Sequence, residues 1–250
     1  MQQDTFQHRF YRSWTTCGRL HAFNVQVDET DLAVKASLPL RQETKQLVVT
    51  LRQELLSYAK RHPRFFTSLR PLGVEPDAPE IAKLMADASA RFGVGPMAAV
   101  AGAIAELAGR DLLRRMAAAG VERPELIIEN GGDCFIKTES PARVQVCPGA
   151  ESPFAGKLAI RIDSAAGPRG VCTSSGTVGH SLSFGSADAV VAVAESAALA
   201  DAAATAIGNE AREERLIGKI LEKEKSRGRL MGLMIVMGER CGAWGGIELA

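Results

Sequence analysis

The 250-residue sequence predicts an α+β fold in which antiparallel sheets pack against long helices. First, apolar and polar residues alternate in His21–Val27 and Asp31–Ala36, with Asp-Glu-Thr between them, which is typical of a hairpin. Second, helical spacing of apolar residues in Arg41–Arg61 marks a helix longer than those of uniform βαβ units. Third, strands, long helices and strands follow one another in each half of the chain. We therefore expect a single domain over residues 1–250, built of two intimately packed halves.

The first half continues with further helices. The helix over 41–61 ends at His62-Pro63, because a proline disfavours helical geometry in the residue before it. A second helix is predicted to begin with Asp77 as its cap, with Glu80 reaching back to it, and to run to about Phe92.

Small residues dominate the next predicted helix, Met97–Ala108, which follows a proline suited to a first helical position. Alanine and glycine let such a helix lie very close to a sheet or to another helix. Its start is also suited to face a phosphate or a metal-bound oxygen. A separate helix is expected over Asp111–Gly120, with the glycine as its stop.

The second half is predicted to alternate strands with helices. The expected strands are Pro124–Glu129, Cys134–Ile136, Lys157–Asp163, Ala189–Ala194, Leu230–Met237 and Trp244–Leu249. Of these, the strand over 189–194 is entirely apolar, so we expect it to be buried on both faces. Ser196 is the expected cap of an alanine-rich helix, and a charged helix follows over Glu210–Arg227.

Composition excludes several classes of function. A net charge of +1 and an aromatic content of 5% give no basis for nucleic-acid or anionic-membrane binding. The N-terminus lacks the apolar core of a signal peptide and no window approaches a membrane span, so we expect a cytoplasmic protein. Five cysteines without a CxxC pair argue against a zinc knuckle and against a disulfide framework.

The candidate chemistry gathers in residues 170–209. A hydroxyl-rich loop comes first: Thr173, Ser174, Ser175, Gly176 and Thr177. Its four hydroxyls and free N–H groups suit an anion such as phosphate, and a polar surface loop is the alternative. His180 follows in the same loop as a candidate general base or phosphate ligand. Cys172 is a candidate nucleophile of a hydrolase, but no neighbour activates the thiol, and simple packing is the alternative.

Two further groups could meet a ligand. Asp201 and Thr205 stand four residues apart on one helix face, and their oxygens suit a hard cation such as Mg²⁺. A solvated aspartate is the alternative. The second group is a segment after a short apolar strand: Asn130, Gly131, Gly132 and Asp133. Its glycines let the backbone approach a ligand, and its polar side chains can bond ribose, phosphate or a ring edge, but a tight turn has the same composition.

Four segments together resemble a short, uncharacterised branch of the ApbE-like superfamily, over about residues 11–248. They are GPMAAVAGAIAE at 95–106, ENGGD at 129–133, CTSSGTVGHSLSF at 172–184 and ADAAATAIGN at 200–209. Characterised members are flavin transferases that attach FMN to a threonine of a target protein. The resemblance implies a duplicated T-fold, FAD as the bound cofactor, and Mg²⁺ that cleaves the pyrophosphate of FAD and activates the FMN phosphoryl group.

The resemblance also assigns roles. It implies that Asp201 and Thr205 bind metal, that the 130–133 segment lies beside the flavin pocket, and that the 173–177 loop and His180 contact phosphate, with Asp201 and His180 as the catalytic candidates. Some determinants of the transferases are absent: Gly95-Pro96-Met97 replaces a Lys-Gly motif, and an Asp-Pro-x-Thr-Gly segment and an N-terminal Ser-Glu-Ile segment are missing. One hypothesis is thus an FMN transferase or FAD pyrophosphatase, with a small phosphorylated cofactor and an acceptor protein as partners. The other is a non-catalytic ligand-binding or assembly protein that kept the fold.

Overall fold

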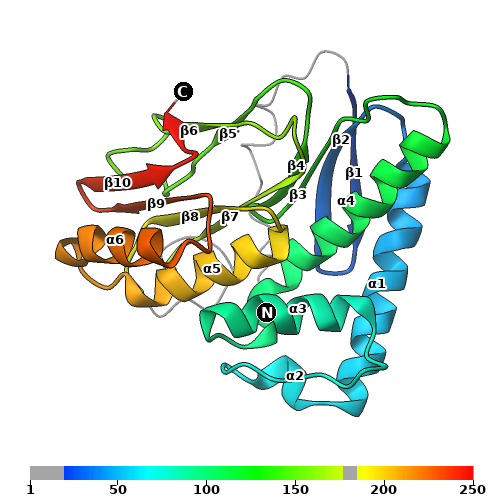
Figure 1. Cartoon of the computed structure of the whole chain (residues 1–250), viewed down its shortest axis with the longest axis horizontal. Coiled ribbons are helices and arrows are strands. Elements are labelled where there is room, and N and C mark those ends of the chain that lie inside the picture. The colour runs from blue at the N-terminus through cyan, green and yellow to red at the C-terminus, as the bar shows by residue number, and fades with distance from the viewer. Residues whose placement is uncertain (1–19, 177–184, 250) are drawn as a thin grey trace, which may run out of the picture.

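The computed structural model describes residues 20–176 and 185–249, which form three layers (Figure 1). The middle layer is an antiparallel sheet in the order β1 (His21–Val27), β2 (Thr30–Ala36), β3 (Leu126–Asn130), β4 (Asp133–Lys137), β7 (Arg169–Ser174), β8 (Ala189–Ala194), β9 (Gly232–Met237) and β10 (Arg240–Gly245). One face carries a small antiparallel sheet in the order β11 (Glu248–Leu249), β6 (Ala159–Ile162) and β5 (Ala142–Gln145).

Helices cover the other face of the large sheet (Figure 1). The helices against the sheet are α1 (Arg41–Arg61), α4 (Val100–Ala118), α5 (Ala197–Glu210) and α6 (Ile217–Arg227). Two more, α2 (Arg64–Thr67) and α3 (Glu80–Phe92), pack on these helices, and short 3-10 turns are η2 (Pro96–Ala99) and η3 (Glu214–Leu216). The predicted packing of antiparallel sheets against helices is confirmed. The duplication of a T-fold stays a prediction.

The core divides along the two faces of the large sheet. Successive residues of β4 point to opposite faces: Phe135 packs among the helices, and Ile136 packs against Ile160 of the small sheet. Strand β8 is buried along its whole length, as its apolar sequence predicts. The close contact of α4 with the sheet depends on Gly109, because a Cβ there would lie 2.3 Å from the Phe135 ring.

The structure corrects the predicted helix boundaries. The two helices expected over 97–108 and 111–120 are one continuous α4 preceded by η2, because Gly109 makes room for an aromatic ring and does not break the helix. Gly120 does end it, with φ at +88°. Helix α3 is preceded by Pro79 without any side-chain cap, so the capping role expected of Asp77 is wrong. The charged helix expected from residue 210 divides, because α5 runs to that residue and α6 begins at Ile217.

The strand predictions need three corrections. The single strand expected over Trp244–Leu249 is divided, since β10 covers Arg240–Gly245 in the large sheet and β11 covers Glu248–Leu249 in the small sheet. Thr173 and Ser174, expected in a hydroxyl-rich loop, instead end strand β7, because both pair with residues of β8. Strand β5 was not predicted, since it is only four residues long and its sequence has no clear alternation.

No single helix of the described residues is long and apolar enough to cross a membrane. Helix α3 and the 96–118 segment reach that length and hydropathy only together, and they are bent by 101° relative to each other.

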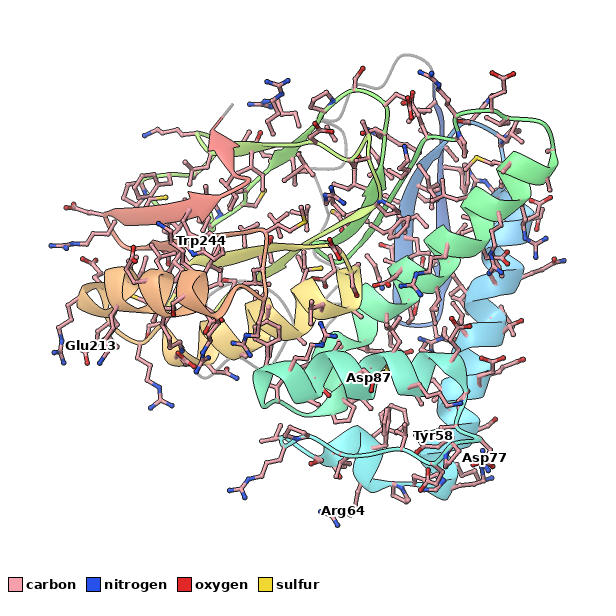
Figure 2. The ribbon with its side chains drawn as sticks, viewed as in Figure 1. Tyr58, Arg64, Asp77, Asp87, Glu213 and Trp244 are labelled. Carbon is pink, nitrogen blue, oxygen red and sulfur yellow. The ribbon has the colours of Figure 1, made fainter. Side chains whose placement is uncertain are left out.

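A cluster of rings (Tyr58, His62 and Phe65) lies where α1 is followed by α2, away from the sheet; Figure 2 labels Tyr58 and Asp77 in this region. The Tyr58 ring stacks on His62 at 4.4 Å between ring centroids and meets Phe65 edge-on at 5.1 Å. Its hydroxyl donates to Glu75 Oε2 at 2.7 Å, and burial raises the pKa of Tyr58 to about 12. These contacts fasten the 68–79 segment to α1.

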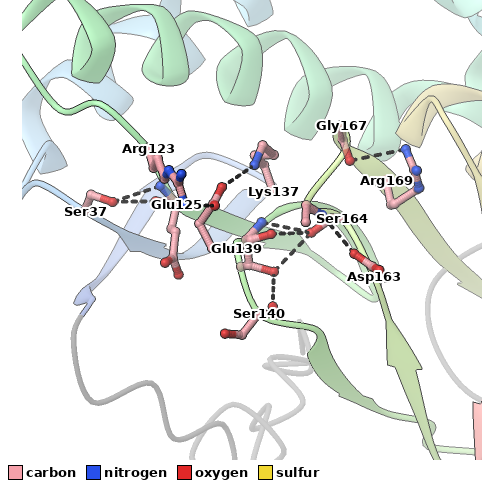
Figure 3. A network of polar contacts seen from close by, with 12 residues as sticks. Ser37, Arg123, Glu125, Lys137, Glu139, Ser140, Asp163, Ser164, Gly167 and Arg169 are labelled. Atoms are coloured by element: carbon pink, nitrogen blue, oxygen red, sulfur yellow. Dashed lines mark hydrogen bonds and ion pairs between the residues drawn. The ribbon is translucent and has the colours of Figure 1, made fainter.

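Polar groups at one end of β3 and β4 satisfy one another (Figure 3). The Thr138 N–H donates to Ser164 Oγ at 2.8 Å, and the two hydroxyls of these residues lie 3.0 Å apart. The Glu125 N–H donates to Ser37 Oγ at 2.9 Å. This network closes that end of the sheet, whereas the candidate residues lie at the opposite end of the same strands.

Candidate functional site

Three neighbouring strands of the large sheet meet at the candidate site. Asn130 ends β3, Asp133 begins β4 directly opposite it, and Cys172 of β7 pairs with Asp133 across the ladder. Alternation along the strands turns these side chains, and that of Ser174, toward the helices. The Asn130 amide accordingly donates to the carbonyl oxygen of Ala101 in α4 at 3.1 Å. The 130–133 segment therefore lies against the start of α4.

The 130–133 segment is a two-residue hairpin turn, as its composition predicts. Gly131 and Gly132 have φ of +70° and +104°, a left-handed conformation that favours glycine. The Gly132 N–H donates to Glu129 Oε1 at 2.8 Å, which holds the turn in shape. The tight-turn interpretation is therefore sufficient for the backbone, and a ligand role depends on Asn130 and Asp133.

Helix α5 presents a single polar stripe. All residues from Ala197 to Gly208 are buried except Asp201 and Thr205, and Asn209 extends the same spacing by another four residues. Residues four apart share one helix face, so the two predicted metal ligands point in one direction. The predicted cap is confirmed, because Ser196 Oγ accepts from the Leu199 N–H at 3.2 Å.

Asp201 reaches across to the first turn of α4. The Gly102 N–H donates to Asp201 Oδ2 at 2.9 Å, and the Ala101 N–H also bonds this carboxylate. These are the second and third residues of α4, whose own cap position, Ala99, has no side-chain acceptor. The sequence makes the start of α4 suited to face a phosphate or a metal-bound oxygen as well as to pack closely; in the structure Asp201 accepts from these two amides.

Asp133, which is buried, and Asp201, which is partly buried, form a pair of interacting acids. Burial raises the pKa of Asp201 to about 7, although the bonds from Gly102 and Ala101 act in the opposite direction. Burial, and then the negative charge of Asp201, raise the pKa of Asp133 well above its ordinary value. Within residues 20–176 and 185–249 neither acid forms an ion pair. A proton or a cation would therefore stabilise this pair.

Cys172 lies beside the acid pair without the features of a nucleophile. Its side chain is fully buried, and the thiol donates to the Ala197 carbonyl oxygen at 3.3 Å. Burial and the nearby Asp133 carboxylate raise the pKa of the thiol well above its ordinary value. The geometry therefore favours the packing role over the hydrolase nucleophile.

The hydroxyl-rich segment divides between a strand and the residues after it. Thr173 and Ser174 end β7 and, by alternation, face opposite sides of the sheet, so they cannot line one nest. The Gly176 N–H donates to the Ala187 carbonyl oxygen at 2.9 Å and is not free. Ser175 lies between these positions. The remaining predicted residues of the segment, Thr177 and His180, lie outside the described residues.

Ser174 is the member of this segment that points into the candidate site. Ser174 is only 6% exposed, and among the described residues its Oγ has no hydrogen-bond partner. An unpaired buried hydroxyl costs about 1–3 kcal/mol, so such a group usually has a bound partner. A ligand oxygen beside Asp133 and Asp201 would supply one.

The donor set fits a hard cation that shares its coordination with a ligand. Asp201, Thr205, Asp133 and Ser174 offer oxygen atoms, which Mg²⁺ prefers. In the part of the chain that the structure describes, no three His, Cys, Asp or Glu side chains cluster closely enough to hold a metal alone. A cation here would therefore complete its coordination with water and with oxygens of the ligand.

Glu106 of α4 was not predicted as part of the site. It is 1% exposed and bonds both Ser196 and the first turn of α5. The one available signal was a lone carboxylate in the otherwise small and apolar segment 97–108, which is costly to bury without partners.

Comparisons with known proteins agree with this architecture. A family model described as AbpE bacteria matches residues 12–226. A UPF0280 protein of Methanococcus aeolicus is 42% identical over 207 residues, with 81% of each chain covered. A UPF0280 protein of Methanopyrus kandleri is 42% identical over 191 residues, covering 76% of this chain and 74% of the relative.

Two solved structures share the fold at low sequence identity. The apo form of the flavinyl transferase ApbE of Pseudomonas stutzeri superposes with a TM-score of 0.59 and 14% identity, covering 90% of this chain and 93% of that one. The ApbE protein of Thermotoga maritima superposes with a TM-score of 0.53 and 13% identity, covering 92% and 97%.

Proposed function

Because the chain belongs to the family described as AbpE bacteria, we propose that it binds FAD or a related phosphorylated cofactor together with Mg²⁺. The proposed reaction is cleavage of the pyrophosphate or transfer of the flavinyl group to an acceptor protein. A cytoplasmic location, a duplicated T-fold and one domain over residues 1–250 remain parts of this proposal.

The acid pair is the observation that carries the proposal. Among the described residues Asp133 and Asp201 interact without a cationic side chain, and the Ser174 hydroxyl has no hydrogen-bond partner. Thr205 lies on the same face of α5 as Asp201. Such an arrangement is unfavourable for a protein alone and favourable for a protein that takes up a divalent cation and phosphate oxygens.

Each residue then has a defined task. Asp201 and Thr205 would hold the metal, Asn130 and Asp133 would line the cofactor pocket, and Ser174 would donate to a phosphate oxygen. Mg²⁺ supplies a positive charge that offsets the charge developing on pyrophosphate oxygens. His180 is proposed to contact phosphate or to act as the general base, and Asp201 remains the second catalytic candidate through its position at the metal.

The alternative is a protein that binds the cofactor without chemistry. Two observations favour it. Asp201 bonds the amides at the start of α4. The sequence also has Gly95-Pro96-Met97 where, by the resemblance, the transferases have a Lys-Gly motif. The lysine of the transferases' motif is therefore missing, while the residues proposed for metal and cofactor binding remain.

The test is to mix purified protein with FAD and Mg²⁺ and to follow flavin fluorescence, AMP release and FMN attached to an added acceptor. Asp201→Asn should abolish Mg²⁺-dependent flavin binding, whereas Asp87→Asn, an exposed aspartate on α3 (Figure 2), should not. Metal-dependent binding without AMP and without flavinylated acceptor would establish the alternative. No flavin binding in the presence of metal would refute both forms of the proposal.

A further inference from the structure

Helices α4 and α5 cap each other's first turns. Asp201 of α5 accepts from Gly102, the third residue of α4, at 2.9 Å and also bonds the amide before it. In return, Glu106 Oε2 of α4 accepts from the N–H of Ala198, the second residue of α5, at 3.0 Å. The same Oε2 accepts from the Ser196 hydroxyl at 2.6 Å. Each helix therefore depends on a carboxylate of the other to satisfy its free amides.

The two helices touch at the point where these bonds form. A Cβ at Gly102 would lie 2.3 Å from the Ala197 carbonyl oxygen and 2.8 Å from the Asp201 Cβ. On the sheet side, a Cβ at Gly170 would lie 2.4 Å from the Ala197 Cα. Backbone contact on both sides leaves the first turn of α5 little freedom to slide or rotate.

Both carboxylate oxygens of Glu106 are bonded in this contact. Its other carboxylate oxygen pairs with Arg110, one turn later on α4 and half-exposed. With bonds from Ser196, Ala198 and Arg110, both oxygens have partners, which is the condition for burying a carboxylate. These partners lie on the first turn of α5 and on α4, and none of them is a residue proposed to bind the ligand.

We infer that Glu106 is a positioning residue: through Ser196 and Ala198 it sets the rotation of the first turn of α5, and so the direction in which Asp201 and Thr205 face the ligand. That a ligand binds at Asp201 and Thr205 rests on the proposed function. The structural link from Glu106 to Asp201 rests on the observed contacts alone. Glu106 acts through α5 and does not touch the cofactor.

The test compares Glu106→Gln with Met116→Ala. Glutamine keeps the shape but lacks the charge and one acceptor oxygen, so it cannot satisfy all three donors. Met116 is fully buried farther along α4, so its truncation destabilises the protein without reaching the start of α5. Two readouts are needed: the Kd for Mg²⁺ alone by calorimetry, and hydrogen exchange of the Gly102 amide.

Glu106→Gln should weaken Mg²⁺ binding by about tenfold or more, the usual effect of losing a residue that orients a metal ligand. It should also speed exchange of the Gly102 amide, whereas Met116→Ala should leave the Mg²⁺ Kd within about twofold of wild type. Glu106→Asp, which keeps the charge, should recover part of both losses.

The outcomes separate the two proposals. Unchanged Gly102 exchange in Glu106→Gln, or equal loss of Mg²⁺ affinity in Met116→Ala, would overturn the positioning role. If wild type and Asp201→Asn bind Mg²⁺ equally, the proposed metal site fails. In that case faster Gly102 exchange in Glu106→Gln would still support the link from Glu106 to Asp201.

Discussion

Raising the pH from 5 to 8 without divalent cations should destabilise the protein through Asp201. Its pKa is about 7 in the folded chain and 3.8 ordinarily. Between these values the folded state binds more protons than the unfolded state, so the free energy of unfolding falls as pH rises, and levels off above pH 7. At about 1.4 kcal/mol per unit, the loss between pH 5 and 7 is at most about 3 kcal/mol, less to the extent that solvent reaches the side chain.

The window is chosen to isolate the acid pair. Some carboxylates have a lowered pKa: Glu29 through a backbone hydrogen bond and then Arg52, and Glu139 and Glu213 through bonds to Lys137 and Arg215. These groups lose their contribution to stability only as pH falls below about 4.5. Asp133 acts in the same direction as Asp201, because its pKa is also raised. A fall in stability above pH 5 that depends on these two aspartates therefore reports on the pair.

The assay is urea unfolding at pH 5, 6, 7 and 8, with Asp201→Asn as the test and Asp87→Asn as the exposed control. The slope between pH 5 and 7 should be much reduced in Asp201→Asn and unchanged in Asp87→Asn. Millimolar Mg²⁺ should increase the free energy of unfolding of the wild-type protein at pH 8. It should have little effect at pH 5, where the acid pair is protonated. Equal slopes in wild type and Asp201→Asn would refute the reasoning.

Three further variants test single features. Gly102→Ala should cost about 1–3 kcal/mol in urea unfolding by forcing α4 from α5, whereas Gly218→Ala, with open space around it on α6, should be neutral or stabilising; equal effects would contradict the close contact. Native alkylation followed by mass spectrometry should label the exposed Cys241 and leave Cys172 unmodified, because its thiol is buried and protonated; rapid labelling of both would reverse that assignment. Ser174→Ala should leave stability unchanged or raise it by up to about 1 kcal/mol and weaken FAD binding in a fluorescence titration; a clear loss of stability would mean that the hydroxyl has a partner in the protein.

Sequence periodicity was sufficient to predict elements that have a clear local pattern or are buried along their whole length. The long helix over 41–61 and the strand over 189–194 are found at their predicted residues, because helical spacing and an unbroken apolar run have few other solutions. It failed where a partner distant in sequence decides the structure. Thr173 and Ser174 of β7 are typical of a loop until β8 pairs with them, and Gly109 resembles a helix break until Phe135 is placed against it.

The site was predictable in part, and mainly through motif resemblance. The spacing of Asp201 and Thr205 places them on one face, but nothing local indicates that Asp133 lies beside them. The bonds of Asp201 to Gly102 and of Glu106 to Ser196 span 99 and 90 residues, and no single-sequence pattern reports contacts at that separation. The interactions among the carboxylates of the site could therefore be identified only from the structure.

The mutual capping of α4 and α5 has a consequence for biosynthesis. Glu106 leaves the ribosome 90 residues before Ser196, so the nascent chain carries an acidic group destined for burial long before its partners exist. Loop closure over that distance is slow compared with helix formation. The starts of α4 and α5 should therefore reach their native structure together and late in folding. We expect a chain arrested before residue 196 to remain protease-sensitive at the start of α4, whatever the stability of its first hairpin.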